Sequence, residues 1–155
     1  MENNQVTQLI MKVDKQIISF IKKHHVLTLA TFDGQQSYCS NVFYAYDIEN
    51  NAFVFYSDDK TKHFNDMKNN KNVAASIVLE TKIIGKIQGL QLNGIATRPN
   101  GEMKKHCYRI YLKRFPYAII SKADLWMLEI TFAKYTNNML GFGKKIIWKK
   151  TDENE

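Results

Sequence analysis

The sequence alternates short runs of β-branched and aromatic residues with polar turns. Residues 26–32 and 37–47 are two such runs, and the dipeptide Asp33-Gly34 lies between them. Two runs joined in this way are typical of a β-hairpin. A third run at residues 52–56 follows the polar segment 49–51. The first third of the chain is therefore predicted to be an antiparallel meander.

The same signal returns in the rest of the chain. Further strands are predicted at residues 73–80, 86–97, 125–132 and 145–149. Two glycines interrupt the second of these runs, and a glycine inside a strand commonly marks a bulge or a close approach by a ligand or another backbone. Six or seven mostly antiparallel strands without long alternating helices predict a mainly β fold, a small closed barrel rather than a doubly wound parallel sheet.

Three segments have helical spacing instead. Residues 5–23 place apolar side chains on one face and end in two lysines and two histidines, cations suited to a helix C-terminus. Residues 60–69 predict a short second helix, and a third is closed by Pro116. With 155 residues and no linker or repeat, the chain is predicted to be one domain, residues 1–155, with the helix at about 5–23 and the barrel at about 26–150.

The formal net charge of +7 raises the question of nucleic acid as a partner. The basic residues are spread along the chain, and most are lysine rather than the arginine that favours bidentate base recognition. We therefore expect a solvated, lysine-rich surface and no nucleic acid partner. Weak RNA binding by a basic barrel stays open as an alternative.

The cysteines and the first residues of the sequence indicate the cellular compartment. Cys39 and Cys107 lack metal-ligand spacing and are expected to be reduced thiols of a cytoplasmic protein. No apolar run approaches the ~18 residues of a membrane span, and the first residues lack a signal-peptide pattern, so no membrane partner is expected. The sequence has no hydrolase motif, no phosphate-binding glycine loop and no paired metal ligands, and no metal is expected.

The strongest local chemistry lies at residues 56–63, where a strand is expected to end and a helix to begin. A helix N-terminus presents amide groups and a positive dipole end that favour a phosphate. An ordinary cap, in which Asp58 or Asp59 bonds the helix amides, explains the same segment without a ligand. Both interpretations stay open. The segment gathers hydroxyls and potential cations: Ser57, Thr61, Lys60, Lys62 and His63.

Two strands offer polar side chains for a planar ligand. On the second strand, Asn41 and Phe43 share one face, and Val42 and Tyr44 share the other. Gln91, flanked by two glycines, has both a donor and an acceptor for a ring edge. A structural role explains the same residues without a ligand: Asn41 can fill a buried polar gap, and Gln91 can belong to a plain strand alternation.

Taken together, these segments resemble the pyridoxamine 5′-phosphate oxidase-like FMN-binding split barrels, and within them the bacterial YhbP-type proteins. The resemblance rests on VLTLATFDG, SYCSNVFYAYD, AFVFYSDDKTKHFNDM, NVAASIVL and GLQLNGIA, on a helix that ends in KRFP, and on LGFGKKIIW. It covers about residues 15–150. The fold that it implies is a six- to seven-stranded antiparallel split β-barrel with flanking helices.

The resemblance also implies a homodimer that holds FMN at the subunit interface. The phosphate would bind at the strand-to-helix junction, and the ring would lie along the second strand near Gln91. A C-terminal stretch with Lys144 and Trp148 can reach the cofactor in this family. The residues assigned to FMN in this way are Ser40, Asn41, Val42, Phe43, Tyr56, Ser57, Thr61, Lys62, His63, Gln91, Lys144 and Trp148.

The resemblance to the oxidases themselves is incomplete. His63 stands where they usually have a second phosphate-binding lysine, and their C-terminal stretch that holds the substrate's phosphate has no counterpart here. We therefore expect a flavin-dependent oxidoreductase or flavin reductase of unknown substrate. The alternative is a non-catalytic flavin or haem carrier, in which a haem ligand would come from His24, His25, His63 or His106.

Overall fold

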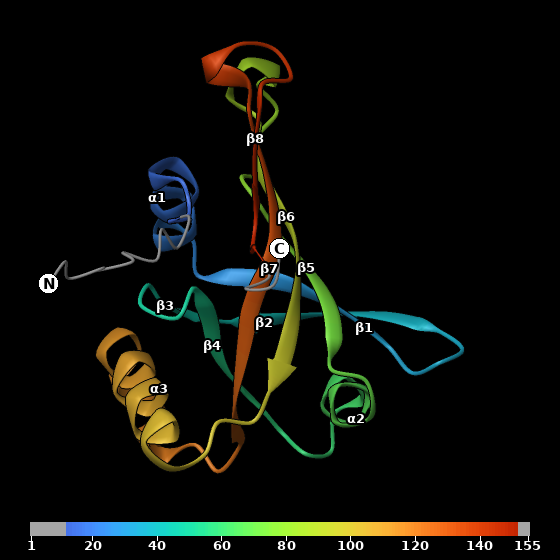
Figure 1. The fold of residues 1–155 in the computed structure, drawn as a ribbon, viewed down its shortest axis with the longest axis vertical. Coiled ribbons are helices and arrows are strands. Elements are labelled where there is room, and N and C mark those ends of the chain that lie inside the picture. The colour runs from blue at the N-terminus through green and yellow to red at the C-terminus, as the bar shows by residue number, and fades with distance from the viewer. Residues whose placement is uncertain (1–11, 152–155) are drawn as a thin grey trace, which may run out of the picture.

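One curled antiparallel sheet forms the body of the molecule in this computed structural model, which describes residues 12–151 (Figure 1). Its strands are β1 (Val26–Phe32), β2 (Ser37–Phe43), β3 (Ala45–Asp47), β4 (Ala52–Ser57), β5 (Asn72–Val78), β6 (Gln88–Thr97), β7 (Asp124–Asn137) and β8 (Lys145–Lys149). The strand order is β2-β1-β5-β6-β7-β4-β3, and β8 also pairs with β7. All pairs are antiparallel, which confirms the predicted split-barrel class.

The single strand predicted at residues 37–47 is two strands with different partners. β2 pairs with β1 as far as Phe43 opposite Val26, where β1 begins, and β3 then pairs with β4. Tyr44 lies between the two strands, and its buried hydroxyl donates to the carbonyl oxygen of Ile21 at 2.6 Å. This anchor lies where the chain passes from one strand partner to another.

In the described part of the chain, six helical segments accompany the sheet: α1 (Lys15–Lys23), α2 (Lys62–Asn69), α3 (Gly101–Arg114) and the 3₁₀ turns η1 (Ile84–Lys86), η2 (Pro116–Ile120) and η3 (Asn138–Leu140). The expected helix at 5–23 begins only at Lys15, because Asp14 caps it by accepting from the amide of Gln16 at 2.7 Å. Residues 5–11 of that expectation lie outside the described residues. Within residues 12–151, no helix has the length and apolar character needed to cross a membrane.

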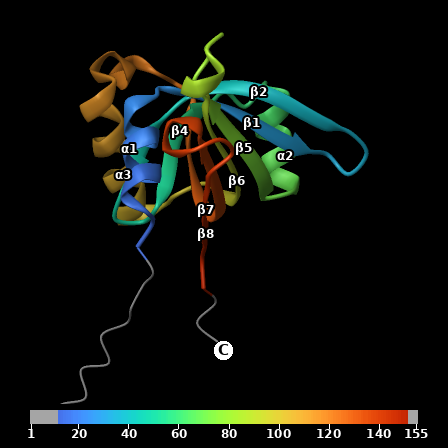
Figure 2. The same cartoon turned by 90° about the horizontal axis from the view of Figure 1, so that it is seen from above.

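The buried side chains form two clusters. The larger cluster lies between the sheet, α1 and α2, and includes Ile17, Phe20 and Ile21 of α1. The smaller cluster lies under α3 and includes Cys107 and Tyr111. Figure 2 shows α1 and α3 on one side of the molecule and α2 on the other. Helices thus flank the sheet on two sides.

Arg114 connects these two regions. Its Nη2 donates to the carbonyl oxygens of Lys22 and His24 at the end of α1. The guanidinium lies over the rings of Tyr44 and Phe115, at 5.2 and 5.6 Å from their centroids. One side chain of α3 therefore satisfies terminal carbonyls of α1 and packs on aromatic rings at the same time.

The strands β6, β7 and β8 continue beyond the body as an arm, with η1 and η3 at its end (Figure 1). The β6–β7 pairing contains a register shift at Asn93 and Gly94. A Cβ atom added to Gly94 would lie 2.4 Å from the carbonyl oxygen of Glu129, so the strands approach here as only glycine allows. The expected bulge is thus confirmed at Gly94, whereas Gly89 lies in regular pairing.

Candidate functional site

The junction between β4 and α2 brings together two hydroxyls and an imidazole. Ser57 is buried at the end of β4, and its Oγ lies 3.2 Å from the Oγ1 of Thr61. Thr61 caps α2: its Oγ1 accepts from the amide of Phe64 at 3.4 Å and donates to the carbonyl of Asp58 at 2.7 Å. The Nε2 of His63 lies 3.4 Å from the same Oγ1. We call Ser57, Thr61 and His63 the α2 corner.

The cap differs from the alternative considered from sequence. Neither Asp58 nor Asp59 caps α2; Asp58 instead accepts from the amide of Lys60 at 2.9 Å, and both acids are exposed. The helix start is therefore capped by a neutral hydroxyl. The amides of the first helical turn favour an anion, and no capping carboxylate is present to repel it.

Lys62 is held by two carboxylates. Its Nζ lies 2.8 Å from the Oδ2 of Asp33 and 3.0 Å from the Oδ1 of Asp66. Asp66 is buried and also accepts from the hydroxyl of Thr31 at 2.7 Å. The hydrogen bond from Lys62 lowers the pKa of Asp33 well below its usual range, and the two acids raise the pKa of Lys62. A phosphate at this lysine would compete with Asp33 and Asp66.

His63 is half-buried, and its burial lowers the pKa of the imidazole. The neutral ring therefore predominates near neutral pH, with one nitrogen as a donor and the other as an acceptor. His63 can donate one hydrogen bond to an anion there, but it does not contribute a full positive charge.

The second strand presents its side chains as expected. Asn41 and Phe43 are exposed, whereas Val42 and Tyr44 are buried. The Oδ1 of Asn41 accepts from the hydroxyl of Thr28 on β1 at 2.9 Å. The Oγ of Ser40 is buried and has no hydrogen-bond partner among the described residues. A buried hydroxyl without a partner is the kind of group that a ligand or a small rearrangement satisfies.

Asn41 and Gln91 lie in one row across the sheet. Thr28 pairs with Asn41 on one side and with Ser76 on the other, and Ser76 pairs with Gln91. We call the face of the sheet that carries this row the outer face. The neighbouring row on the outer face holds small or amide side chains: Cys39, Ala30, Ala74 and Asn93. A hollow of about 400 Å³ lies here; its lining includes Ala30, Ala74 and Asn93, together with Phe32 and Ser37 from the two ends of the β1–β2 hairpin.

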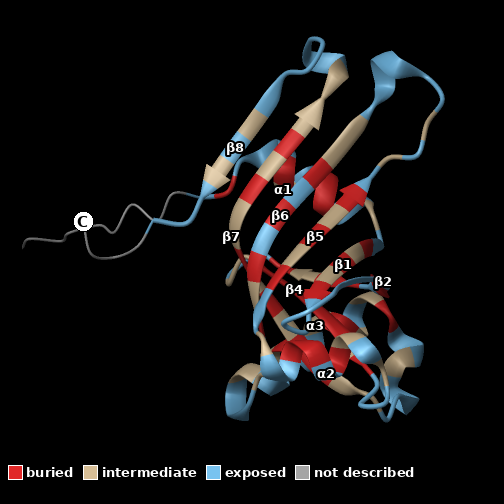
Figure 3. Cartoon of the chain, turned by 90° about the vertical axis from the view of Figure 1, so that its right-hand side faces the viewer, coloured by how far each residue is buried: buried red, intermediate tan, exposed pale blue. Residues whose placement is uncertain are grey.

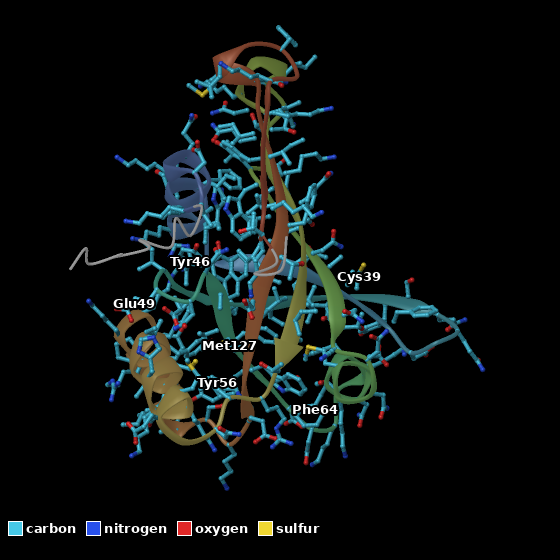
Figure 4. The ribbon with its side chains drawn as sticks, viewed as in Figure 1. Cys39, Tyr46, Glu49, Tyr56, Phe64 and Met127 are labelled. Atoms are coloured by element: carbon cyan, nitrogen blue, oxygen red, sulfur yellow. The ribbon has the colours of Figure 1, made fainter. Side chains whose placement is uncertain are left out.

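Three of the residues assigned to FMN have side chains that lie away from both the α2 corner and the outer face. Tyr56 packs edge-on against Tyr111 of α3, with ring centroids 4.9 Å apart, and Figure 4 shows Tyr56 beside α3 and far from Cys39. Trp148 pairs with the buried Ala133, on the face opposite to Gln91, and packs on the core. Lys144 lies at the end of the arm, between η3 and β8.

The sequence did not indicate one cluster that the structure shows. His106 of α3 bonds the buried Asp47 at 2.9 Å, and Glu49 offers a carboxylate within 4.8 Å of both. These three side chains could hold a metal ion. However, the hollow that they line also contains Lys22 and Lys113, whose charges oppose a divalent cation. We interpret the contact between His106 and Asp47 as a hydrogen bond that fixes α3 on β3. Its partners are 59 positions apart in the sequence, so an analysis of residue spacing does not find it.

The curled antiparallel sheet, closed by helices and carrying a strand-to-helix corner, defines the class as a split barrel. The model of the pyridoxamine 5′-phosphate oxidase family matches residues 13–137, and the chain belongs to that family. A UPF0306 protein of Photorhabdus laumondii is 37% identical over 131 residues, which cover 84% of this chain and 92% of the relative. This likeness confirms the resemblance drawn from the sequence motifs.

Solved structures share the fold at low sequence identity. A heme binding protein from Mycobacterium smegmatis superposes with a TM-score of 0.71 at 20% identity, covering 84% of this chain. The chain spans only 55% of the length of that protein. An FAD binding protein from the same organism superposes with a TM-score of 0.62 at 13% identity, covering 79% of this chain and 92% of the other.

Proposed function

We propose that the chain binds FMN, with the phosphate at the α2 corner and the ring on the outer face of the sheet. The observation that carries the proposal is the convergence of Ser57, Thr61 and His63 at the start of α2. The hydroxyl of Ser57 and the imidazole of His63 can each donate to a phosphate oxygen where the helix amides and dipole favour negative charge. The hydroxyl of Thr61 can do the same if it exchanges its bond to the carbonyl of Asp58 for one to the phosphate.

The outer face suits the ring of a flavin. Small side chains on β1 and β5 leave a flat floor, and the amides of Asn41, Gln91 and Asn93 can bond the polar edge of a planar molecule. The β1–β2 hairpin adjoins both regions, since Phe32 and Ser37 line the hollow and Asp33 bonds Lys62.

Lys62 supports the proposal through an exchange of partners. Asp33 is about one-third exposed at its side chain, so it can release Lys62 to a phosphate and return to solvent at small cost. Asp66 is buried and keeps its bond from Thr31 in that exchange. The ammonium would then balance part of the phosphate charge.

The proposal includes a homodimer. The contact of Asp66 with Thr31 places α2 against the inner side of β1, whereas Asn41 and Gln91 lie on the outer side. One chain therefore does not present the α2 corner and the outer face of the sheet on the same side. A second copy that covers the outer face would exclude water from the ring and complete the pocket.

A bound isoalloxazine would supply hydride and electron transfer, and the chain would orient the ring and shield it from water. We therefore infer a flavin-dependent oxidoreductase or flavin reductase of unknown substrate that works in the cytoplasm. Both described cysteines are free thiols, in keeping with a reducing compartment.

Haem is the second candidate ligand, because a haem-binding protein shares the fold. His24 has one ring nitrogen bonded to the carbonyl of Phe20, and His106 is bonded to Asp47. His25 is exposed, and His63 is half-buried in the α2 corner. His63 is thus the histidine that we propose as the iron ligand if haem is bound.

The test compares FMN with riboflavin, which has the same ring and no phosphate. We expect the purified protein to bind FMN at least about tenfold more tightly, since charge-assisted hydrogen bonds to phosphate contribute about 1.5–3 kcal/mol. The variant Ser57→Ala should weaken FMN binding and leave riboflavin binding unchanged. Ser121→Ala removes an exposed hydroxyl away from the corner and should change neither.

Equal affinity for the two flavins would contradict the phosphate site. A Soret band on addition of haem, lost in His63→Ala, would favour haem instead. Reduction of bound FMN by NADH or NADPH faster than that of free FMN separates an oxidoreductase from a carrier.

A further inference from the structure

The end of the arm carries apolar side chains that the rest of the described chain does not cover. We define the arm tip as residues 81–87 and 138–145, which include η1 and η3. Figure 3 shows this end of the molecule mostly in the colour of exposed residues. The large apolar side chains of the tip are between 38% and 81% exposed: Ile83, Ile84, Ile87, Met139, Leu140 and Phe142.

Hydrogen bonds hold the two segments of the arm tip together. The amide of Asn138 donates to the carbonyl of Ile87 at 3.0 Å, and its side-chain Nδ2 donates to the carbonyl of Ile84 at 2.9 Å. Its Oδ1 accepts from the amide of Gly143 at 3.2 Å. The exposed apolar side chains are therefore presented on a fixed frame, so little order has to be gained when they bind a surface.

The charges of the arm tip are all positive. The two segments contain four lysines and neither aspartate nor glutamate, and the exposed Glu80, which directly precedes the first segment, still leaves a net charge of +3 at this end of the arm. The lysines, Lys82, Lys86, Lys144 and Lys145, are all exposed. An apolar centre with a cationic surround complements a surface that is apolar inside and anionic at its boundary.

We propose that the arm tip docks on the surface of an anionic phospholipid bilayer. Phe142 and the neighbouring apolar side chains enter the boundary between headgroups and acyl chains, and the lysines remain at the level of the lipid phosphates. This interaction is peripheral and reversible, and it departs from the sequence-based expectation of no membrane partner. It does not depend on the proposed cofactor.

A second copy of the chain is a poorer match for the arm tip. In a symmetric contact between two tips, the lysines of both copies would face one another and repel. The rest of the chain also carries an excess of positive charge, with a net charge of +7 overall. Another exposed apolar group, at η2, includes Ile120 but is followed by Lys122 and Asp124, whose charges cancel, so it lacks the net positive charge of the arm tip.

The test is vesicle co-sedimentation of the full chain. We expect binding to phosphatidylcholine vesicles that contain about 30% phosphatidylserine, little binding to pure phosphatidylcholine, and loss of binding in about 0.5 M salt. Phe142→Ser should lower the partition coefficient about tenfold. Ile120→Ser removes an equally exposed apolar side chain at η2 and should have no effect.

Charge is tested separately. The double variant Lys82→Gln, Lys86→Gln should lose about fivefold for each lysine, whereas Lys113→Gln, Lys122→Gln should lose little. Equal binding to neutral and anionic vesicles, or an equal loss in the η2 and tip variants, would overturn the proposal. A change of oligomeric state in lipid-free Phe142→Ser would show that the tip packs on another copy, and would overturn it as well.

Discussion

The surroundings of the two described cysteines give them different chemistry. Cys39 is exposed on β2, whereas Cys107 is a fully buried residue of α3. Burial raises the pKa of the Cys107 thiol to about 11, so only about one molecule in a thousand carries the reactive thiolate at pH 8. We expect a thiol reagent to label one cysteine in the folded protein and both in denaturant. Rapid labelling of two thiols in the folded protein, measured by mass spectrometry, would contradict this.

The site residues that could be predicted from the sequence are those that lie close to one another along the chain. Ser57, Thr61 and His63 lie within seven positions of one another, so a strand end and a helix start suffice to bring them together. The partners of Lys62 were not predictable in this way, because Asp33 is 29 residues away and meets it only through the packing of α2 on the β1–β2 hairpin. The capping role of Thr61 rather than Asp58 also depends on the turn geometry.

At the scale of elements, the β-bulge in β6 makes a direct prediction. A Cβ atom at position 94 would lie 2.4 Å from the carbonyl oxygen of Glu129 and 2.6 Å from the Cδ2 of Leu128, so Gly94→Ala should destabilise the protein by about 1–3 kcal/mol. Gly89→Ala is the matched control on the same strand, since its nearest contact of 3.7 Å is ordinary. Urea denaturation measures both, and a similar loss in the two variants would refute the argument.

The strands were mostly predictable from alternation and turns, and the errors have physical causes. The split of residues 37–47 at Tyr44 was missed because both halves have strand character; only the choice of partner separates them. The late start of α1 follows from the cap at Asp14, which competes with an apolar pattern that continues upstream. β7 is longer than predicted, because its last residues pair with both β6 and β8.

At the scale of the whole molecule, Arg114 joins α3 to the end of α1. Arg114→Ala should lower the free energy of unfolding by about 1–3 kcal/mol, because carbonyl groups of α1 lose a charged donor and two rings lose a cation. Arg114→Lys keeps the charge without the planar fork and should lose an intermediate amount. Arg109→Ala, at an exposed position of the same helix, is the control. Equal stability of all variants in urea would contradict this role.

The overall class was predictable because antiparallel runs without βα units leave few architectures, and the family motifs selected one of them. The arm was not predictable, because its length depends on how far β6, β7 and β8 pair beyond the body. The position of the α2 corner relative to the outer face of the sheet was not predictable either, since it depends on which side of β1 the helix α2 covers.

The central place of β7 has a consequence for synthesis on the ribosome. β7 pairs with β6 along one edge and with β4 and β8 along the other, yet it lies near the end of the chain. A nascent chain that has emerged only as far as α3 therefore leaves both β4 and β6 with an unpaired edge, and such edges invite aggregation. The N-terminal two-thirds of the protein must wait for the last strands, or be shielded until they arrive.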